Sequence, residues 1–506
     1  MGLMNKAGEG AQSTSIDSST IKSATSRGAL WLSITSIIAA PLAFYRNWVL
    51  GQLGTDGGVV GNFALILLLV EVTTTFVMFG GGTAVIYYVS RLPTKNEKAS
   101  FLFSYLILSV PTALMFLVAI RSWPQILSLL TNQSTDMSVI NMLVWFVPLV
   151  ILSQLTIYGM SGIMHFRALS LLLQLQLFVV SAFGTVAYLF FPNIILGDSL
   201  LVLGEVVGAA FLVVILVGGV SIVRELGFSR LEFELPSGFW RYAAYVQGNT
   251  LCTFAELSID KIFVLSSLGV RELGAYFVLS QCAELIRLVP VRLGQVLLAA
   301  FSKLIVEGRG QELERSYSSM SRLMAVISSC CAFTMIIFSQ PIAAIFGSWV
   351  SQMHEILIIL SVLFSVSSVS SINGMLILAK ERTGAFLAVN TLMISVQFVL
   401  TMLLIGKYSV FGVVAGRLIG GVVGQVGLFL IVRSLLDGVK LGPPNVYWIN
   451  QLLVVSAAVF VLVFQERPLY VSLTVLLAAI LFSLYTIRDE LRKLVVGGGF
   501  RNAQIP

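Results

Sequence analysis

The chain has 506 residues, of which 57% are hydrophobic and only 11% are charged, and its mean hydropathy is +0.95. Water-soluble domains usually carry ~25% charged residues, so this composition excludes an ordinary soluble protein and indicates a protein with many membrane spans. The net charge of +7 does not indicate a nucleic-acid partner, because the Lys and Arg residues are spread along the chain rather than gathered in a basic run.

Residues 1–27 are rich in Ser and Thr and lack a short apolar core followed by a cleavage site. We interpret them as a disordered cytoplasmic tail rather than a signal peptide. A helix needs ~20 apolar residues to cross a bilayer, and the remaining chain contains fourteen such stretches. The first six lie at about 28–50, 60–88, 99–120, 138–159, 168–191 and 198–221. Six more lie at about 241–265, 274–300, 318–346, 353–378, 384–405 and 410–432, and a final pair at about 446–464 and 468–487.

The predicted fold class is therefore an all-α polytopic membrane protein. A polar stretch near the middle of the chain divides the first twelve spans into two sets of six. We predict an N-terminal lobe at 28–223, a cytoplasmic linker at 224–240, a C-terminal lobe at 241–435, a last helix pair at 446–487 and a cytoplasmic tail at 488–506.

The distribution of basic residues supports this division and sets the orientation. With the N-terminus in the cytoplasm, twenty-one of the 31 Lys and Arg residues fall in the cytoplasmic tails and loops. The opposite loops hold only Arg121, Arg271, Lys407 and Arg467. Because cytoplasmic loops carry the excess of basic residues in membrane proteins, we predict that both termini are cytoplasmic.

The two predicted lobes begin with similar sequences, at residues 46–71 and 260–295. With a two-residue gap in the turn, the matched positions are Arg46 and Lys261, Leu53-Gly54 and Leu268-Gly269, Gly61 and Gly274, and Glu71 and Glu284. The sixth and twelfth spans also match, with Glu205 opposite Arg417. Chance alignment is the alternative for the matched Leu, Val and Gly, whereas the coincident charges favour an internal repeat of the kind found in transporters.

Six basic residues remain inside the predicted spans, namely Arg46, Lys261, Arg287, Arg292, Arg322 and Arg417. A charge at the centre of a membrane helix costs ~2.5–3.5 kcal/mol on insertion scales, so it usually faces a partner or a cavity. Arg46 and Lys261 lie near the outer ends of their helices, where a long side chain reaches either the interface or an internal site. Arg322, near the cytoplasmic start of its span, is interpreted as an interface anchor.

Glu71 and Glu284 lie about 15 Å into their helices at 1.5 Å per residue, so neither reaches water without a cavity. Glu284 is three residues from Arg287, which permits an ion pair on one helical face. Glu71 has no such partner on its own helix, and two interpretations remain open. It takes up protons, because burial disfavours a charged carboxylate, or it pairs across a cavity with a cation such as Arg287. The other intramembrane acids that we expect to act in coupling are Glu205, Glu256 and Asp260.

The sequence carries no enzyme signature. Its two His residues, His165 and His354, lie in different predicted loops, and it contains no metal-binding, phosphate-loop or nucleophile motif. We therefore expect a transporter with no cofactor and no metal. The alternative outside this class is an enzyme of glycan polymerisation, which usually needs a larger outer loop than the one at residues 121–137.

The run SIDKIFVLSSLGVRELGAYFVLSQCAELIRLVPVRLGQVLLAAFSKL, residues 258–304, resembles the seventh and eighth helices of Wzx-type polysaccharide flippases. These flippases belong to the multidrug/oligosaccharidyl-lipid/polysaccharide (MOP) exporter superfamily. Residues 26–54 resemble their first helix, and the resemblance covers roughly residues 26–435 in plan. It implies two six-helix lobes around a central cavity, alternating access, and a lipid-pyrophosphate-linked glycan as cargo. Arg46 matches in position the cations with which such flippases hold anionic substrate.

We therefore expect a flippase that carries an undecaprenyl-pyrophosphate-linked oligosaccharide across the plasma (inner) membrane for polysaccharide, O-antigen, lipopolysaccharide or exopolysaccharide biosynthesis. The expected substrate-binding cations are Arg46, Lys261, Arg287, Arg292 and Arg417. The expected partners are membrane lipids, a glycan polymerase and glycosyltransferases. A MATE-like antiporter of drugs or small molecules and a lipid II flippase are the alternatives, and the first helix lacks the buried acid of many multidrug exporters.

Overall fold

The computed structural model describes residues 41–486 with gaps at 54–57, 79–80, 123–136, 191–198, 228–231, 436–444 and 465–468, and at positions 93, 164, 234, 237, 307 and 381. Residues 35, 39 and 488 are also described. The described chain is built from helices, beginning with an unlabelled helix at residues 41–52.

The helices of the first half of the chain are α2 (Gly58–Val77), α3 (Gly81–Arg91), α4 (Lys95–Ser122), α6 (Met137–Gly162), α7 (Phe166–Phe190) and α9 (Ser199–Leu226). Those of the second half are α10 (Phe239–Leu268), α11 (Val270–Val306), α12 (Gly310–Ile337), α13 (Ser339–Ile345), α14 (Ser348–Ser351), α15 (His354–Val366), η1 (Ser367–Val369), α16 (Ser370–Ala379), α17 (Thr383–Tyr408) and α18 (Val410–Leu435). The last pair is α19 (Asn445–Val463) and α20 (Leu469–Thr486).

The all-helical prediction is confirmed for the described chain. Nine of its helices are long and apolar enough to cross a membrane. Helices α10 and α11, at 30 and 37 residues, are longer than any of the nine but carry most of the intramembrane charges. The count of fourteen spans, the lobe boundaries and the orientation remain predictions.

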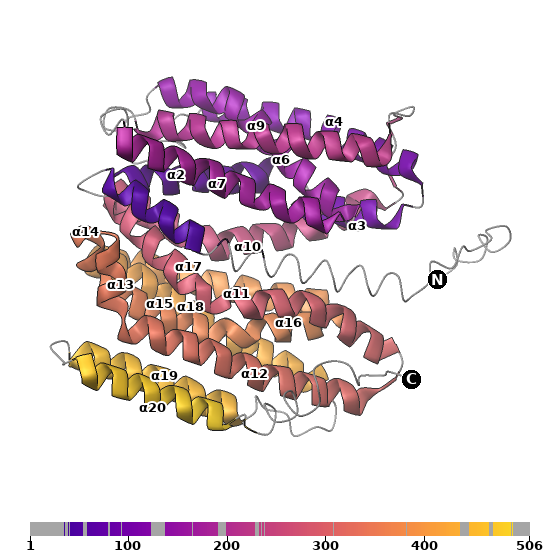
Figure 1. The fold of residues 1–506 in the computed structure, drawn as a ribbon. Coiled ribbons are helices and arrows are strands. Elements are labelled where there is room, and N and C mark those ends of the chain that lie inside the picture. The colour runs from indigo at the N-terminus through magenta and orange to yellow at the C-terminus, as the bar shows by residue number, and fades with distance from the viewer. Residues whose placement is uncertain are drawn as a thin grey trace.

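The helices of the two halves lie on opposite sides of the molecule. Figure 1 shows α2, α4, α6, α7 and α9 on one side and α11, α12, α15, α16 and α18 on the other. Helix α10 lies between them and packs on α2 and α3 as well as on α11 and α17. The pair α19 and α20 lies at the edge, against α12. Helix α10 is therefore the element through which the charges of both sides are brought together.

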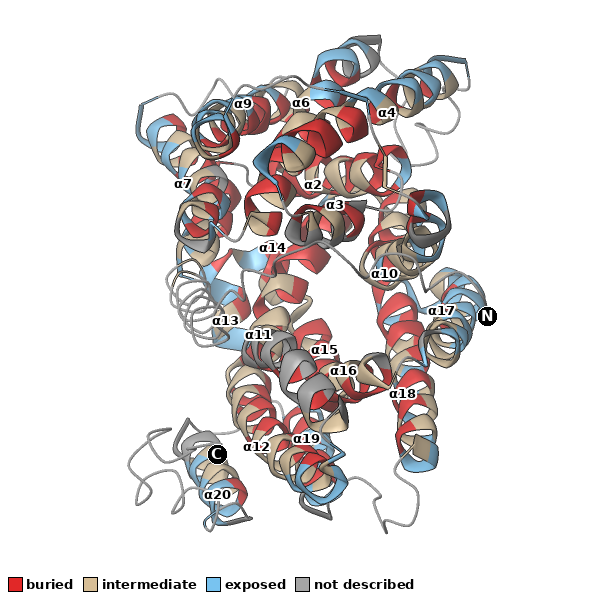
Figure 2. Cartoon of the chain, turned by 90° about the vertical axis from the view of Figure 1, so that its right-hand side faces the viewer, coloured by how far each residue is buried: buried red, intermediate tan, exposed pale blue. Residues whose placement is uncertain are grey.

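Apolar side chains cover both the inner and the outer surfaces of the helices. In Figure 2 the buried segments face inward and the exposed segments lie at the periphery. Many of the exposed residues are large and apolar, such as Met115 at 72%, Leu171 at 69% and Leu403 at 70%. Soluble proteins rarely expose so much apolar surface, so these outer faces fit contact with lipid.

A single tight turn joins α10 to α11 and brings the second half against α2. Gly269 is the only residue between the two helices, and its φ of 111° lies in the left-handed region that favours glycine. The adjoining Val270 carbonyl lies so close to α2 that a Cβ at Gly61 would approach its oxygen to 2.0 Å. The predicted Leu-Gly turn is thus confirmed, and a second glycine permits the contact.

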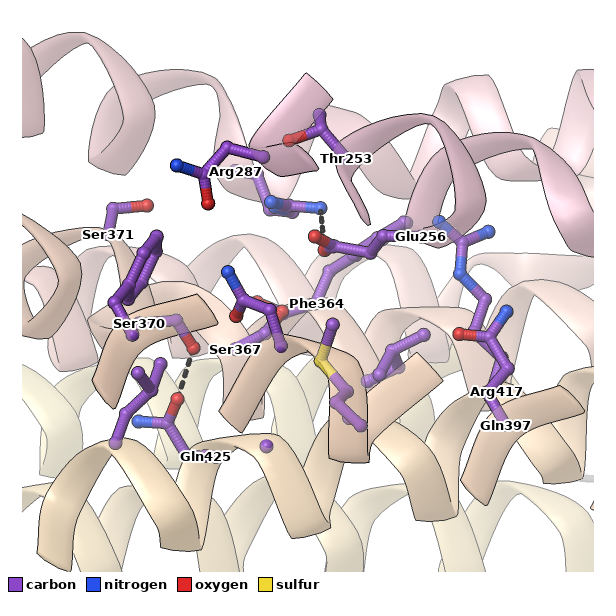
Figure 3. Close-up of a pocket in the computed structure, with 18 residues that line it drawn as sticks. Thr253, Glu256, Arg287, Phe364, Ser367, Ser370, Ser371, Gln397, Arg417 and Gln425 are labelled. Carbon is purple, nitrogen blue, oxygen red and sulfur yellow. Dashed lines mark hydrogen bonds and ion pairs between the residues drawn. The ribbon is translucent and has the colours of Figure 1, made fainter. Parts of the chain in front are cut away.

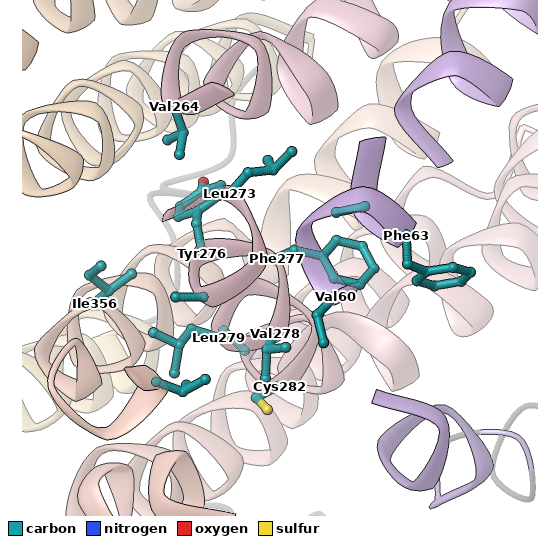
Figure 4. Close-up of a cluster of buried hydrophobic side chains, with 14 of the residues drawn as sticks. Val60, Phe63, Val264, Leu273, Tyr276, Phe277, Val278, Leu279, Cys282 and Ile356 are labelled. Carbon is teal, nitrogen blue, oxygen red and sulfur yellow. The ribbon is translucent and has the colours of Figure 1, made fainter. Parts of the chain in front are cut away.

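Beyond this contact, α2 and α11 form an apolar seam that joins the two halves. Figure 4 shows Val60 and Phe63 of α2 facing Phe277 and Val278 of α11. The rings of Phe63 and Phe277 meet edge to face, with centroids 6.2 Å apart. These four side chains are each 2% exposed or less. Between membrane helices, van der Waals packing rather than removal of apolar surface from water is the source of association, so the seam joins the halves by close packing.

Candidate functional site

Two adjacent residues of α10, Asp260 and Lys261, carry opposite charges in the interior. Both are buried, Asp260 at 0% and Lys261 at 8% exposure. Successive residues of a helix point about 100° apart, so the two side chains reach different neighbours. Asp260 contacts the second half of the chain and Lys261 contacts the first half.

Asp260 forms a closed network with Arg417 of α18 and Tyr276 of α11. The Arg417 guanidinium and the Tyr276 hydroxyl both donate to Asp260 Oδ2. Arg417 Nη1 also donates to the Tyr276 oxygen at 2.9 Å. Arg417 is only 4% exposed. Removing one partner from a buried ion pair costs ~3–5 kcal/mol, because the other charge is left without compensation.

Lys261 pairs with Glu71 across the boundary between α10 and α2. The distance from Lys261 Nζ to Glu71 Oε1 is 3.1 Å, and the Ser258 hydroxyl donates to Glu71 Oε2. The Glu71 side chain is 38% exposed, so it borders open space while its partner is buried. The structure therefore agrees with the second interpretation of Glu71, which is a pair with a cation on another helix. The cation is Lys261 rather than Arg287.

Arg287 of α11 pairs with Glu256 of α10, at 3.7 Å between Nη1 and Oε1. The pair that the i,i+3 spacing permits, between Arg287 and Glu284, is not formed in the described structure. Glu284 instead accepts a hydrogen bond from Gln281 Nε2 at 3.1 Å. The reason is that Glu256 faces Arg287 from a neighbouring helix.

The ring of Phe364, on α15, lies between the guanidinium groups of Arg287 and Arg417. Their carbon centres are 5.4 Å and 5.3 Å from its centroid. A cation over a desolvated aromatic face gains ~2 kcal/mol or more, so Phe364 helps to hold both Arg residues inside the protein. Sequence reasoning missed this residue, because nothing in an apolar helix distinguishes one Phe from another.

A cavity of about 190 Å³ lies beside these two Arg residues. Its walls come from α10, α11, α15, η1, α16, α17 and α18. Figure 3 shows polar side chains from these helices around it, including Thr253, Ser367, Ser370, Ser371, Gln397 and Gln425. The sequence did carry a signal for part of this wall, because Asn249, Thr253 and Glu256 recur every three or four residues on one face of α10.

Arg46 lies apart from this network, in the helix at residues 41–52. It is 9% exposed, and its guanidinium donates to Asn47 Oδ1 from Nη2 at 2.9 Å and covers the Phe63 ring at 4.6 Å. Among the described residues, no carboxylate lies within ion-pair distance of it. Arg46 therefore has no acidic partner in the described structure, whereas Lys261, Arg287 and Arg417 each have one.

Two further predicted residues lie elsewhere. Glu205 is exposed on α9, and none of the contacts of the charged network involves it. Arg292 lies in α11, and its side chain is outside the part of the chain that the structure describes.

Comparison by sequence finds no matching family model and no matching curated protein. Comparison by fold gives clear matches. The lipid II flippase MurJ, in an inward closed conformation, matches with a TM-score of 0.70 and 15% identity over 92% of this chain and 100% of its own. An inward-facing multidrug resistance MATE family transporter of the MOP superfamily matches with a TM-score of 0.62 and 13% identity over 82% of this chain and 100% of its own. The Vibrio cholerae MATE transporter VcmN matches with a TM-score of 0.59 and 14% identity over 83% of this chain and 98% of its own.

The chain has the fold of these transporters. At 13–15% identity the likeness lies in the arrangement of the helices. The charged network is therefore interpreted from the residues of this chain alone.

Proposed function

We propose that this protein is a membrane transporter of the MOP superfamily that flips a lipid-pyrophosphate-linked oligosaccharide across the plasma membrane by alternating access. The observation that carries the proposal is the match of fold to a lipid II flippase over 92% of this chain and the whole of that one. The predicted resemblance of residues 258–304 to Wzx-type flippases supports an oligosaccharide cargo for polysaccharide or O-antigen biosynthesis. We propose no enzymatic activity, because the proteins of matching fold are transporters and a flippase.

The buried cations suit a cargo with a negatively charged pyrophosphate. Arg46 has no acidic partner in the described structure, so it is the cation best placed to take up a phosphate oxygen first. Lys261 and Arg287 are held by acids, and their release requires that the acids exchange partners. Arg292 and Arg417 complete the proposed binding set. A charge-assisted contact in a low-dielectric site is strong because the competing water is excluded.

The pair of Glu71 and Lys261 gives a physical basis for alternating access. It joins α2 of the first half to α10, at the boundary along which the proposed lobes 28–223 and 241–435 would separate. An anion that binds Lys261 in place of Glu71 would release this link. Binding can shift a conformational equilibrium only by its difference in affinity for the two states, and exchange of this partner supplies such a difference. Glu284, Glu256 and Asp260 would then respond to the new positions of the cations.

The proteins of matching fold carry two other functions. A multidrug transporter is favoured by the matches to MATE proteins, and a lipid II flippase by the match to MurJ. The flippase match covers 92% of this chain against 82% for the first of the multidrug transporters. We therefore place a lipid-linked cargo first, with membrane lipids, a glycan polymerase and glycosyltransferases as partners and both termini in the cytoplasm.

Reconstitution separates the three functions. The purified chain in vesicles should expose a fluorescent polyprenyl-pyrophosphate-linked oligosaccharide to a membrane-impermeant glycosidase, and vesicles without protein should not. Faster flipping of lipid II than of the oligosaccharide would identify a lipid II flippase. Efflux of a cationic dye without flipping of either lipid would identify a multidrug transporter and overturn the proposal.

A further inference from the structure

The cavity beside Arg287 and Arg417 has a lining that the charges alone do not explain. From its polar wall we infer that it binds one neutral sugar ring, which deepens the proposed function and rests on it. At ~30 Å³ per water molecule, about 190 Å³ holds roughly six waters. This is the space of one six-membered sugar ring with its hydroxyl groups.

The first observation is an unpartnered buried amide. Gln397 of α17 is 2% exposed and lines the cavity, and its Nε2 has no hydrogen-bond partner among the described residues. Asn249 Oδ1, on α10, also lines the cavity and has no partner among the described residues. Buried polar atoms are nearly always hydrogen-bonded to protein, water or ligand. Gln425 Nε2, also on the cavity wall, has no partner among the described residues either. The cavity therefore presents two donors and one acceptor without partners in the described chain, and sugar hydroxyls satisfy both kinds.

The second observation is the balance of charge. Arg287 is paired with Glu256, and Arg417 is paired with Asp260. In this arrangement of the helices each cation at the cavity already has its anion, so the wall offers little net attraction to a charged ligand until the acids exchange partners. A neutral ligand with several hydroxyl groups enters without breaking either pair.

The third observation is the mixture of polar and apolar side chains. Phe386 and Met393 of α17 and Leu363 of α15 line the same cavity as the amides and serines. Ligand pockets typically combine apolar surface with a few placed polar groups. The C–H face of a sugar ring would lie on the apolar side chains while its hydroxyls meet Gln397 and Asn249. Thr253, which is exposed on α10, marks the side from which the ring enters.

Thermal unfolding of the purified full-length protein tests this pocket without a transport assay. The probes are D-glucose, D-galactose and N-acetyl-D-glucosamine, with L-glucose at equal concentration to correct for the general stabilisation that sugars give as excluded solutes. At tenfold above its dissociation constant, the preferred D-sugar should raise Tm by about 2 °C more than L-glucose does.

Two matched substitutions assign the shift to the cavity. Gln397→Met should abolish the sugar-dependent shift while leaving the Tm of the free protein unchanged or higher, since it removes an unsatisfied buried amide. Gln451→Met, in α19, removes an equally buried amide that bonds Ser365 at 3.2 Å outside the cavity. It should lower the Tm of the free protein and keep the shift.

Several results would overturn the inference. One is the absence of any D-sugar-specific shift in the unmodified protein, and another is an undiminished shift in Gln397→Met. A larger shift with D-glucuronate or inorganic phosphate would assign the cavity to an anion. Flipping is measured separately in vesicles. If the protein flips the lipid-linked glycan but shows no sugar-dependent shift, only the assignment of the cavity is overturned. If it shows the shift but flips neither lipid, the proposed function is overturned.

Discussion

Arg46 and Lys261 occupy matching positions of the predicted repeat, and both are buried. Lys261 holds the carboxylate of Glu71 at 3.1 Å, whereas Arg46 contacts the Asn47 amide and the Phe63 ring and no carboxylate in the described part of the chain. The other matched positions differ in the same way. Arg417 is buried and paired with Asp260, and its counterpart Glu205 is exposed. The matched positions thus differ in their charge partners. Lys261, Arg287 and Arg417 in the second half each have an acidic partner, whereas Arg46 has none among the described residues.

The largest effect should come from the most buried pair. Arg417→Met leaves Asp260 at 0% exposure without its cation, so the free energy of unfolding should fall by ~3–5 kcal/mol. The double variant with Asp260→Leu removes both charges and should recover most of the loss. The thermal unfolding temperature and the yield of monodisperse protein in detergent are measured for the single and the double variant. Glu205→Gln, at the matching position, is the control and should change neither. Equal melting of Arg417→Met and Glu205→Gln would contradict the buried pair.

A smaller effect is expected at the seam between the halves. Gly61→Val places a side chain where the Val270 carbonyl lies, and overpacking of this kind costs ~1–3 kcal/mol. Gly219→Val in α9 is the matched control, since a Cβ there meets nothing within 4 Å. Both glycines are helical, so the difference between the two variants isolates the seam. A similar change in melting temperature in both would mean that Gly61 does not pack on Val270.

Substitution of Lys261 and substitution of Glu71 should destabilise the protein by different amounts, although the two residues form one pair. Lys261→Met leaves Glu71, whose side chain is 38% exposed and can be hydrated, so the loss should be ~1 kcal/mol or less. Glu71→Gln leaves the buried Lys261 facing a neutral amide and should destabilise more than Lys261→Met does. Chemical denaturation of the two variants side by side measures the order. The reverse order would place Glu71, not Lys261, in the less hydrated environment.

The helices were predictable and their charge pairs were not, for a physical reason. A membrane helix is fixed by its own ~20 apolar residues, so the predicted range 384–405 falls within α17 and 410–432 within α18. An ion pair is fixed by which helices become neighbours. Lys261 and Glu71 are 190 residues apart, and Arg417 and Asp260 are 157 apart. Local spacing therefore favoured Glu284 for Arg287, and a neighbouring helix supplied Glu256 instead.

The candidate cavity shows the same limit. Its amides and hydroxyls come from α10, η1, α16, α17 and α18, and spacing along one helix groups only some of them, such as Asn249, Thr253 and Glu256 on α10. Gln397 is one of several polar residues of α17 in sequence. The fold distinguishes it, because its Nε2 lies on the cavity wall without a partner among the described residues. Residue type indicated polar positions inside the membrane, and the packing of helices decided which of them share a site.

The smallest effect on stability is expected at Arg46. The same substitution should have a large effect on transport. Arg46→Gln leaves no described carboxylate unpaired. The lost contact with Phe63, worth ~0.5–2 kcal/mol, is offset by relief from burying a charge, so the free energy of unfolding should change by less than ~1 kcal/mol. Flipping of a pyrophosphate-linked glycan in vesicles should nevertheless fall at least tenfold, because one desolvated contact of ~1.4 kcal/mol or more with the anion is lost. Arg46→Lys, which keeps the charge, should retain part of the flipping rate. The rate at which a neutral polyprenol-linked glycan is flipped should not change in either variant. Full flipping by Arg46→Gln would show that the cation without an acidic partner does not hold the cargo, and would assign that role to cations released from their acids in another conformation.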